Sequence, residues 1–517
     1  MMKSRTLIEH NSYYDSVELM SLSNTITNRE GVTDAIVAMA TEMNKNLLNN
    51  IELATKESKN AGQNDLIIAV KAVDKITLDN TFDFINEQLN SKKSSNQKEN
   101  LKASTLKQGL EILPDANMAI ISCPGKYAFY EGKKALNKGL NIMIFSDNMT
   151  ISEEKELKEL GIKKNLLVMG PDCGTAIINQ IGLCFSNKVE KGSIGLVAAS
   201  GTGLQEVSVQ ISRMGFGISQ AIGTGGRDLH EEVGGLMMLE GIKRLDRDIN
   251  TKVITLISKP PSELVQNKII KQVKKVSKPV IICFLDGDKE SIENEGMIYA
   301  PTLIQAAKKS VLAIKKDEII KSNITNSVIS NVENEIDKLN NSQKFIKGLF
   351  CGGTLTSEAL CVIREEVNLV KSNVSRNKYE KTMTPFEEEH HLLLDLGSDE
   401  FTEGKPHPMI EPNLRNQYIV QEAGKKSTAV LLLDFEIGYG SHQDPVGESL
   451  DTLIEAKEIA KSNNCYLSIV AYVCGTEKDK QNLKNQEKKL RDIGVIVADS
   501  NEMASNIASM IANREVI

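Results

Sequence analysis

The sequence predicts an α/β protein of several domains whose sheets are mostly parallel. Short apolar runs alternate with longer amphipathic runs along the chain, which is the pattern of strands joined by helices. Several apolar runs end in glycine turns that pass directly into helical patterns. A chain of 517 residues is long enough for three or four domains, each with its own core.

The first part of the chain divides into two predicted regions. Residues 1–60 read as an N-terminal α/β segment with a helical start at Ser16. Residues 61–190 read as a Rossmann-like domain that contains a polar loop over residues 92–102. Its strands are expected at 66–73 and near Met118, Asn141 and Asn165.

The second part divides into two α/β domains and a linker. The first domain spans residues 191–314, with strands expected near Ile194, Ile218, Val253 and Val280. Residues 315–344 are charged and poor in large apolar side chains, and they predict a partly helical linker. The last domain spans residues 345–517 and holds a polar insertion over 371–389. Its strands are expected near Leu349, Leu392, Val430, Leu467 and Val495.

The composition excludes several classes of protein. A net charge of -7 without a basic stripe argues against a nucleic-acid partner. No apolar run reaches the ~18 residues of a membrane span, and the N-terminus lacks the apolar core of a signal peptide. The eight cysteines lack paired CxxC spacing, so they predict reduced thiols in the cytoplasm and no metal site.

Two glycine turns predict an anion-binding crevice. Ser200, Gly201, Thr202 and Gly203 follow an apolar run and open a helix, where free backbone N–H groups favour an anion. A second turn over 223–228 contains Gly225, Gly226 and Arg227 after the next apolar run. The alternative is that the glycines only satisfy tight turns. The pair of turns, with hydroxyls and an arginine, favours a phosphate or carboxylate site.

Other strand ends carry further candidates. The segment 348–360, with Gly352, Gly353 and Thr354, echoes 195–207 in its order of strand, glycine turn and helix, through either duplication or chance. The turn 122–125 would suit a phosphate or a pantetheine arm, although an ordinary turn explains it equally well. Three further polar segments follow predicted strands. The first contains Asp172, Cys173, Gly174 and Thr175, the second consists of the loops that hold His407 and His442, and the third contains Cys474, Gly475 and Thr476.

The reactive side chains in these turns have plainer interpretations. Cys173 lacks a histidine near it in sequence, which favours an inert thiol over a nucleophile. A metal site from His407, His442 and nearby carboxylates is not supported by their spacing, which favours hydrogen bonding within loops. His390 and His391 are expected to be structural.

Eight motifs in order make the chain resemble the FdrA family, over residues from about Ser16 to Met510. They are MGPDCGTAI, ASGTGLQEV, AIGTGGRDL, SKPP, CGGT, FTEGKPHPMIEP, GYGSHQDP and VCGT. FdrA proteins resemble the alpha subunit of succinyl-CoA synthetase and other NDP-forming acyl-CoA ligases. The resemblance implies a Rossmann-like domain of the CoA-binding type followed by two flavodoxin-like ligase domains. It matches 170–173 to the ligases' Gly-Pro-Asn-Cys turn, 200–202 to their Ser-Gly-Thr phosphate turn, and 225–226 to their Gly-Gly pair.

One departure from the ligases bears on mechanism. The ligases carry a phosphoryl group on a histidine after the last strand of the first ligase domain, and here residues 279–303 contain no histidine. His230 is the only histidine of that domain and follows a different strand. The ligases' glycine-rich CoA loop is also not recognisable in residues 66–101. No cofactor is therefore certain, and CoA or a nucleotide remains open.

The resemblance implies a role in anaerobic allantoin and purine degradation, as one subunit of an oxamate carbamoyltransferase with several different subunits. Its substrates would be small anions: phosphate, carbamoyl phosphate and oxamate. Arg227, Lys259 and His442 are the catalytic candidates, and the glycine turns are the binding candidates. We expect Arg227→Ala or Gly201→Val to impair phosphate-dependent turnover without unfolding. The alternatives are an acyl-CoA ligase without the relay histidine and a non-catalytic scaffold subunit.

Overall fold

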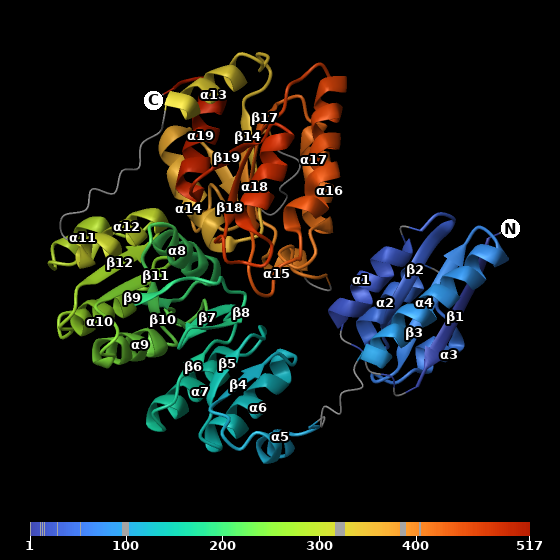
Figure 1. The fold of residues 1–517 in the computed structure, drawn as a ribbon, viewed down its shortest axis with the longest axis horizontal. Coiled ribbons are helices and arrows are strands. Elements are labelled where there is room, and N and C mark those ends of the chain that lie inside the picture. The colour runs from blue at the N-terminus through green and yellow to red at the C-terminus, as the bar shows by residue number, and fades with distance from the viewer. Residues whose placement is uncertain are drawn as a thin grey trace. The chain divides into compact units, whose positions relative to one another are not determined.

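The computed structural model describes residues 2–10, 12, 14, 16–27, 29–51, 53–95, 103–315, 326–382, 389–402 and 405–516. The chain forms two compact units (Figure 1). The first comprises Met1–Ile112 with Thr402–Pro406, and the second comprises Leu113–Phe401 with His407–Ile517. No helix in the described ranges has the length and apolar character of a membrane span.

The first unit contains an antiparallel sheet of three strands in the order β1-β3-β2. Alternate residues of the central strand face two different cores, so helices cover both faces: α1 and α4 on one, α2 on the other. The elements are β1 (Lys3–Glu9), α1 (Ser16–Thr27), β2 (Val32–Met39), α2 (Glu42–Asn50), α3 (Lys56–Asn60), β3 (Leu66–Ala72), α4 (Lys75–Ser95) and α5 (Leu106–Ile112).

The boundary predicted between residues 60 and 61 is wrong. The strand expected at 66–73 pairs with both β1 and β2 in one sheet, so residues on either side of the predicted boundary share a core. The polar character of 92–102 was also misleading at its start, because α4 continues to Ser95. Residues 96–102 lie outside the described ranges.

A small parallel sheet, β4-β5-β6, begins the second unit, with helices α6 and α7 beside it. The predicted strands near Met118 and Asn141 are confirmed, and the third starts slightly later than predicted. The elements are β4 (Met118–Ile121), α6 (Gly125–Asn137), β5 (Asn141–Ile144), α7 (Ile151–Lys163) and β6 (Val168–Met169).

The first flavodoxin-like domain has a seven-stranded sheet in the order β13-β12-β11-β9-β10-β7-β8. Its four expected strands are confirmed as β9, β10, β11 and β12. The hairpin β7–β8 pairs with β10 although it precedes the predicted boundary at residue 190, which corrects that boundary. The elements are β7 (Thr175–Ile178), β8 (Ile181–Cys184), β9 (Lys191–Ala198), α8 (Gly201–Arg213), β10 (Ile218–Gly223), α9 (Leu236–Arg247), β11 (Val253–Ser258), α10 (Glu263–Val273), β12 (Val280–Phe284), α11 (Lys289–Glu293), β13 (Ile298–Tyr299) and α12 (Leu303–Ile314).

The second flavodoxin-like domain has a parallel six-stranded sheet in the order β15-β16-β14-β17-β18-β19, and all five expected strands are present. The predicted linker contains α13, and residues 316–325 and 383–388 lie outside the described ranges. The elements are α13 (Asn326–Ile336), β14 (Phe345–Phe350), α14 (Gly353–Glu366), β15 (Val370–Ser372), β16 (His391–Asp395), α15 (Asp399–Thr402), α16 (Asn413–Ala423), β17 (Thr428–Glu436), α17 (Pro445–Ser462), β18 (Ser468–Cys474), α18 (Leu483–Asp492), β19 (Ile496–Ala498) and α19 (Asn501–Asn513).

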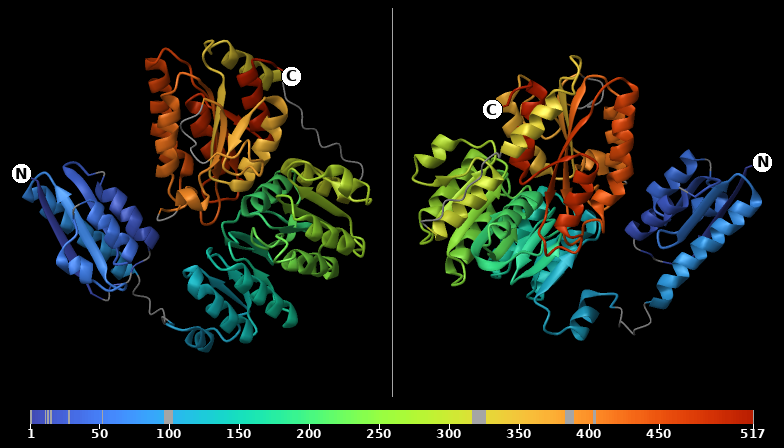
Figure 2. Two further views of the ribbon diagram at one scale, coloured as in Figure 1. Left: turned by 180° about the vertical axis from the view of Figure 1, so that it is seen from behind. Right: turned by 45° about the horizontal axis from the view of Figure 1, so that its top comes forward.

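The two flavodoxin-like domains share one hydrophobic core. Helices α8 and α12 of the first domain and α14 and α19 of the second contribute apolar side chains to it. Figure 2 shows α8 and α14 (green and yellow-orange) between the two sheets from two further directions. A second core joins β5 and β6 to the opposite face of the first flavodoxin-like sheet. These shared cores fix where the strand ends of the three domains meet.

Candidate functional site

The N-termini of α8 and α14 meet at the boundary between the flavodoxin-like domains. Ser200 caps α8, with its Oγ accepting from the Gly203 N–H at 2.9 Å. The Ser200 Oγ also lies 2.5 Å from Thr354 Oγ1, and the Thr354 N–H donates to Thr202 Oγ1 at 3.3 Å. The two segments that resemble one another in sequence are therefore in direct contact.

Glycine permits this close approach at α14. A β-carbon on Gly352 would lie 3.0 Å from Thr202 Cγ2 and 2.8 Å from Glu436 Oε1, and one on Gly353 would overlap the Asp395 carboxylate. The first turn of α14 is thus enclosed by a threonine of one domain and carboxylates of the other. Any larger residue would force the helix ends apart.

Three backbone N–H groups at this junction have no described acceptor: those of Gly201, Thr202 and Gly353. The neighbouring N–H groups of Cys351 and Gly352 donate to Asp434 at 2.7 and 2.9 Å. Helix N-termini carry partial positive charge, so these donors would suit a small anion, and anion binding at them stays a prediction. The structure thus agrees with the sequence in the position of the first predicted turn.

The Asp434 carboxylate accepts hydrogen bonds from the glycine turn that precedes α14. With Cys351 and Glu436 it forms a buried group with potential ligand atoms for a cation, the one such group found in the described ranges. Arg415 lies 3.5 Å from Asp434 Oδ1, and the Asp434 oxygens already accept two N–H groups. Burial and the neighbouring Asp434 raise the pKa of Glu436 well above its usual value. These contacts indicate a structural role.

Lys259 follows β11 and supplies a cation without a partner. Among the described residues, none accepts a hydrogen bond from its ammonium or forms an ion pair with it. Burial lowers the pKa of Lys259, while Asp395 and Asp172 oppose that shift. The side chain therefore lies within the field of carboxylates from two other segments, close to where β11 ends.

Two carboxyl groups in this region have raised pKa values. Burial raises the pKa of Asp395 to about 6 against the effect of Lys259, and its Oδ1 accepts the Gly397 N–H at 2.9 Å. The pKa of Asp172 is also raised to about 6, first by burial and then by Asp399 and Asp147. Both groups therefore titrate near neutrality.

The second predicted turn packs tightly against the turn that holds Asp172. A β-carbon on Gly225 would overlap the Pro171 carbonyl, and one on Gly223 would overlap the Thr175 carbonyl. Gly226 is open by comparison, with its added β-carbon 3.4 Å from Asp172 Oδ2. Close packing thus explains two of these glycines, and anion binding by Gly225 and Gly226 stays a prediction.

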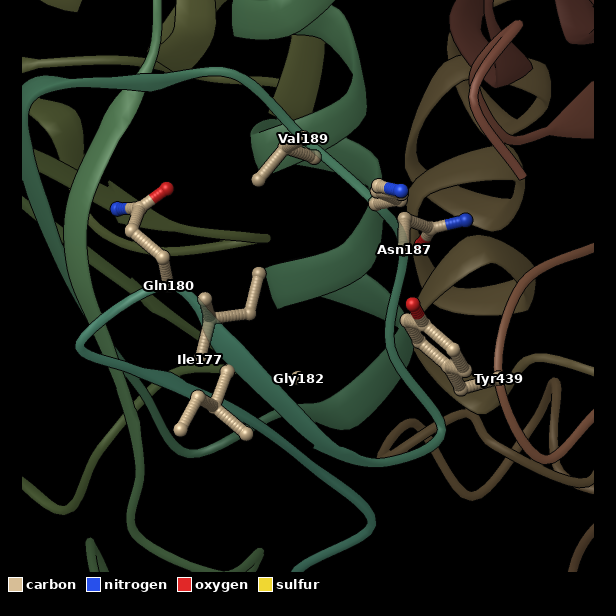
Figure 3. A pocket seen from close by; sticks show the side chains of 8 residues that line it. Ile177, Gln180, Gly182, Asn187, Val189 and Tyr439 are labelled. Atoms are coloured by element: carbon tan, nitrogen blue, oxygen red, sulfur yellow. The ribbon is translucent and has the colours of Figure 1, made fainter.

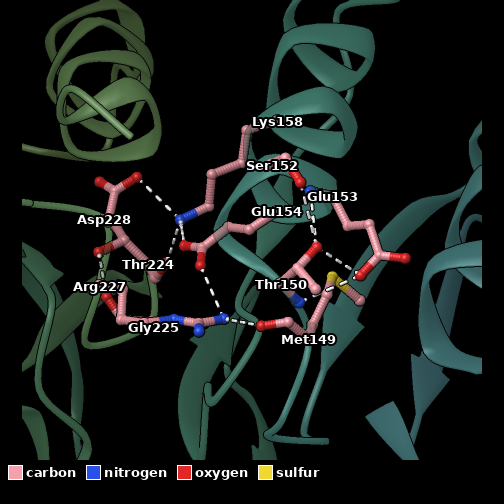
Figure 4. A network of polar contacts seen from close by, with 10 residues as sticks. All are labelled: Met149, Thr150, Ser152, Glu153, Glu154, Lys158, Thr224, Gly225, Arg227 and Asp228. Atoms are coloured by element: carbon pink, nitrogen blue, oxygen red, sulfur yellow. Dashed lines mark hydrogen bonds and ion pairs between the residues drawn. The ribbon is translucent and has the colours of Figure 1, made fainter. Parts of the chain in front are cut away.

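Arg227 belongs to a buried network between α7 and the second turn (Figure 4). It lies 3.0 Å from Glu154 Oε2 and donates to the Met149 carbonyl at 2.8 Å. Lys158 is fully buried and contacts Glu154 at 2.7 Å and Asp228 at 2.9 Å. Arg227 therefore connects two domains, and only part of its guanidinium is available to a ligand.

The remaining predicted turns lie in other environments. Burial raises the pKa of Cys173 to about 12, which agrees with an inert thiol. The Gly174 carbonyl accepts from Phe185 N at 2.8 Å, and Thr175 begins β7. Cys474 is buried, the Gly475 carbonyl accepts from Arg213 at the C-terminal end of α8, and Thr476 donates to the Lys188 carbonyl at 2.8 Å. The structure does not bring this last turn to the paired N-termini.

The two histidines of the last domain hydrogen-bond within loops. The Nδ1 atoms of His407 and His442 accept the N–H groups of Met409 and Asp444 at 3.2 and 3.1 Å. Burial lowers the pKa of His407 to about 4, so its imidazole is neutral. The catalytic role predicted for His442 has no support from a contact with Lys259 or Arg227 in the described residues. It stays a prediction.

A separate cavity of about 400 Å³ lies beside the β7–β8 hairpin (Figure 3). Ile177, Val189 and Tyr439 give it apolar walls, and Lys188 is its charged group. None of the residues predicted from sequence lines it. Its walls offer no arrangement of reactive groups, so the cavity is not part of the candidate site.

Sequence reasoning missed Asp395, Asp434 and the pair Glu154 and Lys158. The two aspartates end or nearly end apolar strand patterns, which is a signal that would have flagged them. Glu154 and Lys158 are four residues apart in a highly charged helix and look like a solvated ion pair. Only tertiary packing shows that both are buried.

Comparisons with known proteins place ligase-type domains on the second unit. A CoA-ligase family model matches residues 349–511, and a CoA binding domain model matches residues 189–285. The latter match lies after residues 61–190, for which the sequence resemblance implied CoA binding. A third model, the heavy metal-associated domain of AllF, matches residues 2–105.

The metal implied by that third description does not fit the residues present. Soft heavy metals are bound by cysteine thiolates, and the first cysteine of the chain is Cys123. The one histidine of the matched segment, His10, has its Nδ1 3.0 Å from Asp65 Oδ2. The residues of this unit therefore do not supply the thiolates that a soft metal ion would need.

One curated relative matches nearly the whole chain, and the ligase subunits match about a third of it. It is 42% identical to YahF of Escherichia coli K12, over 96% of both chains. It is 25% identical to the alpha subunit of the ADP-forming succinate–CoA ligase of Methanothermobacter thermautotrophicus, over 34% of this chain and 58% of that one. It is 28% identical to SqwL, an ADP-forming sulfoacetate-CoA ligase subunit of Acholeplasma sp, over 34% and 61%.

Among solved structures, ATP citrate lyase from Methanothrix soehngenii is similar with a TM-score of 0.35 and 12% identity, over 79% of this chain and 82% of that one. That score is too low to compare domain arrangements. The length of the match to YahF and the two ligase-type domain matches agree with one another. The chain belongs to the FdrA family, whose members are related to the alpha subunit of succinyl-CoA synthetase and other NDP-forming acyl-CoA ligases.

Proposed function

We propose that this acyl-CoA synthetase-like chain is a subunit of an oxamate carbamoyltransferase. The reaction interconverts oxalurate plus phosphate with oxamate plus carbamoyl phosphate. The observation that carries the proposal is the set of free N–H groups of Gly201, Thr202 and Gly353, together with an unpartnered Lys259 that feels the charge of Asp395, the carboxylate next to Gly353. Such a site suits two small anions held next to one another.

The chemistry of carbamoyl transfer fits this arrangement. One anion attacks the carbamoyl carbon of the other substrate, and no phosphoenzyme is required. Backbone N–H groups and Lys259 would stabilise the charge that develops in the tetrahedral state. The absence of histidine from residues 279–303 is compatible with this route, since direct transfer has no need of a relay.

The alternative is acyl-CoA ligase activity, which the names of several relatives favour. A ligase of that class would need another group to carry phosphate. The imidazole of His407 is neutral and lies against Gly397, where an added β-carbon would overlap its Nε2. Its Nδ1 is already an acceptor for Met409 N–H, so the free nitrogen faces packed protein.

The test uses the full chain together with the subunits encoded beside its gene. Carbamoyl phosphate formed from oxalurate and phosphate is measured, in parallel with thioester formation from CoA, a nucleotide and a small carboxylate. We expect carbamoyl phosphate and no phosphorylated chain. Removing a well-placed donor typically costs ~3 kcal/mol of barrier, so Lys259→Met should lower the phosphorolysis rate by roughly 100-fold.

The control variant is Lys268→Met, since Lys268 lies on α10 away from the N–H groups. It should retain the wild-type rate. Nucleotide-dependent thioester formation with a phosphorylated chain, and no carbamoyl phosphate, would refute the proposal.

A further inference from the structure

Asp172 is an ionisable side chain held in an unusual position. Its backbone is in the left-handed region, with φ of 52°, and its N–H donates to the Ser146 carbonyl at 3.0 Å. Non-glycine residues in this conformation are uncommon, and Asp and Asn are the ones that tolerate it best. The turn therefore holds the Asp172 backbone in a conformation that few residue types adopt, and such conformations are often found at functional sites.

Asp172 is exposed at the surface as a residue, although the protein atoms around its carboxyl group raise its pKa, and this carboxyl group has no hydrogen-bond partner among the described residues. It lies next to Gly226, whose added β-carbon would be 3.4 Å from Oδ2. Carboxylates that serve structure in this chain, such as Asp228 and Asp434, have N–H donors or cations bound to both oxygens. Asp172 has neither, so its carboxyl group is available to a ligand.

Charged groups from several elements face Asp172. Asp147 follows β5, Asp399 begins α15 and Glu154 lies on α7, and these negative groups favour the protonated form. Arg227 favours the ionised form. Lys259 follows β11, and the charges of Asp395 and Asp172 both act to raise its pKa. The turn that holds Asp172 also reaches the N-terminus of α8, because a β-carbon on Gly201 would lie 3.3 Å from Thr175 Oγ1, and Lys259 lies within electrostatic reach of Asp172.

The matching turn of the ligases is Gly-Pro-Asn-Cys, as the resemblance described above implies. This chain therefore has an ionisable carboxyl group where an amide stands in the ligases, and it lacks their histidine. Without the histidine, no imidazole carries a phosphoryl group. A carboxyl group in place of the amide can give and accept a proton, which is what acid–base catalysis requires.

We propose that Asp172 is the acid–base residue of the carbamoyl transfer, which rests on the function proposed above. A phosphate oxygen attacks the carbamoyl carbon of oxalurate, and the bond between that carbon and the oxamate nitrogen breaks. The Asp172 carboxylic acid gives its proton to the departing nitrogen, so that oxamate leaves as a neutral amide. The proton of the bound hydrogen phosphate then returns to the Asp172 carboxylate, which balances the cycle. In the reverse direction the carboxylate accepts the proton of the attacking amide.

The test compares Asp172→Asn with wild type in the full complex. Asparagine tolerates the left-handed backbone and has the same size, so the variant is expected to fold. We expect kcat to fall at least 100-fold with the KM for phosphate changed less than threefold, since general acid–base catalysis contributes about 10²- to 10⁴-fold. Wild-type phosphorolysis should also slow as the pH rises through the Asp172 pKa, and this limb should disappear in the variant.

Asp147→Asn separates acid–base catalysis from a general effect of charge. It removes a negative neighbour of Asp172, so the alkaline limb should move to lower pH while the maximal kcat stays within threefold. An Asp172→Asn enzyme with near-wild-type kcat, or with an unchanged limb, would overturn the role of Asp172. A wild-type complex that forms no carbamoyl phosphate would instead overturn the proposed function itself.

Discussion

Arg227 has two roles that its sequence context does not separate, the predicted one of an anion ligand and that of a partner in a buried ion pair. It stands in a glycine-rich turn, where a basic side chain suggests an anion ligand. In the structure its guanidinium pairs with the fully buried Glu154, and only 30% of its side chain is exposed. Removal of a partner from a buried charge is costly, because the remaining charge loses its compensation. The expectation that Arg227→Ala leaves the protein folded stays a prediction, but the variant should lose part of its stability.

Arg227→Ala should lower the free energy of unfolding by about 2 kcal/mol, between the values for exposed and buried pairs. The fold should persist because Lys158 still contacts Glu154. Urea unfolding followed by circular dichroism measures the difference. Arg491→Ala is the control, since the Arg491–Glu487 pair lies within one helix and should cost roughly 0.5 kcal/mol. Equal losses in the two variants would contradict the role assigned to Glu154.

At the scale of elements, α8 and α14 form a related pair whose buried acids face one another. Glu206 and Glu358 hold the same position in the two helices, six residues after the N-terminal Ser200 and Gly352. Glu206 accepts from the Tyr472 hydroxyl, and Glu358 accepts from Leu303 N at 2.6 Å and Asn501 Nδ2 at 2.8 Å. Each acid thus ties its helix to other elements of the interface.

Glu358 should make stability depend on pH. Burial, and then Glu206, raise the pKa of Glu358 from 4.5 to about 8. The folded chain holds a proton there that the unfolded chain has lost, so stability should fall as the pH rises from about 5 to about 8. Glu358→Gln should flatten this dependence, which urea unfolding at several pH values measures. Glu365→Gln, at an exposed position on the same helix, should behave like wild type. A variant of Glu358 with the wild-type slope would refute the assignment.

At the scale of the whole molecule, shared cores connect the domains of the second unit, and Cys173, Cys283 and Cys474 belong to these cores. All eight cysteines are free. Burial raises the pKa of Cys173 and of Cys361 to about 12, and it raises those of Cys283, Cys351 and Cys474 well above the usual value of a thiol. The thiolate is the reactive form, so these groups should be inert.

Titration of the native chain with Ellman's reagent should label at most three thiols rapidly, those of Cys123, Cys184 and Cys465. Denaturation in guanidinium should then release all eight. Mass spectrometry of the labelled peptides identifies the sites. Rapid modification of Cys173 in the native chain would show that its turn opens, contrary to the packing described here.

The sequence by itself determined the class of fold, most strands of the two flavodoxin-like domains and the position of the first glycine turn. These features are local, because strand and helix periods and glycine turns are written in consecutive residues. The placement of β3 and of the β7–β8 hairpin depended on pairing with distant strands, which no local pattern reveals.

The tertiary structure alone decided which turns share a site. In the structure Ser200 contacts Thr354 across the two domains, whereas the Cys474 turn lies at the C-terminal end of α8. It also left Lys259 and Asp172 without partners in the described part of the chain while burying Lys158. The physical reason is that burial and electrostatic partnership depend on atoms brought together from remote parts of the chain, whereas periodicity depends only on neighbours.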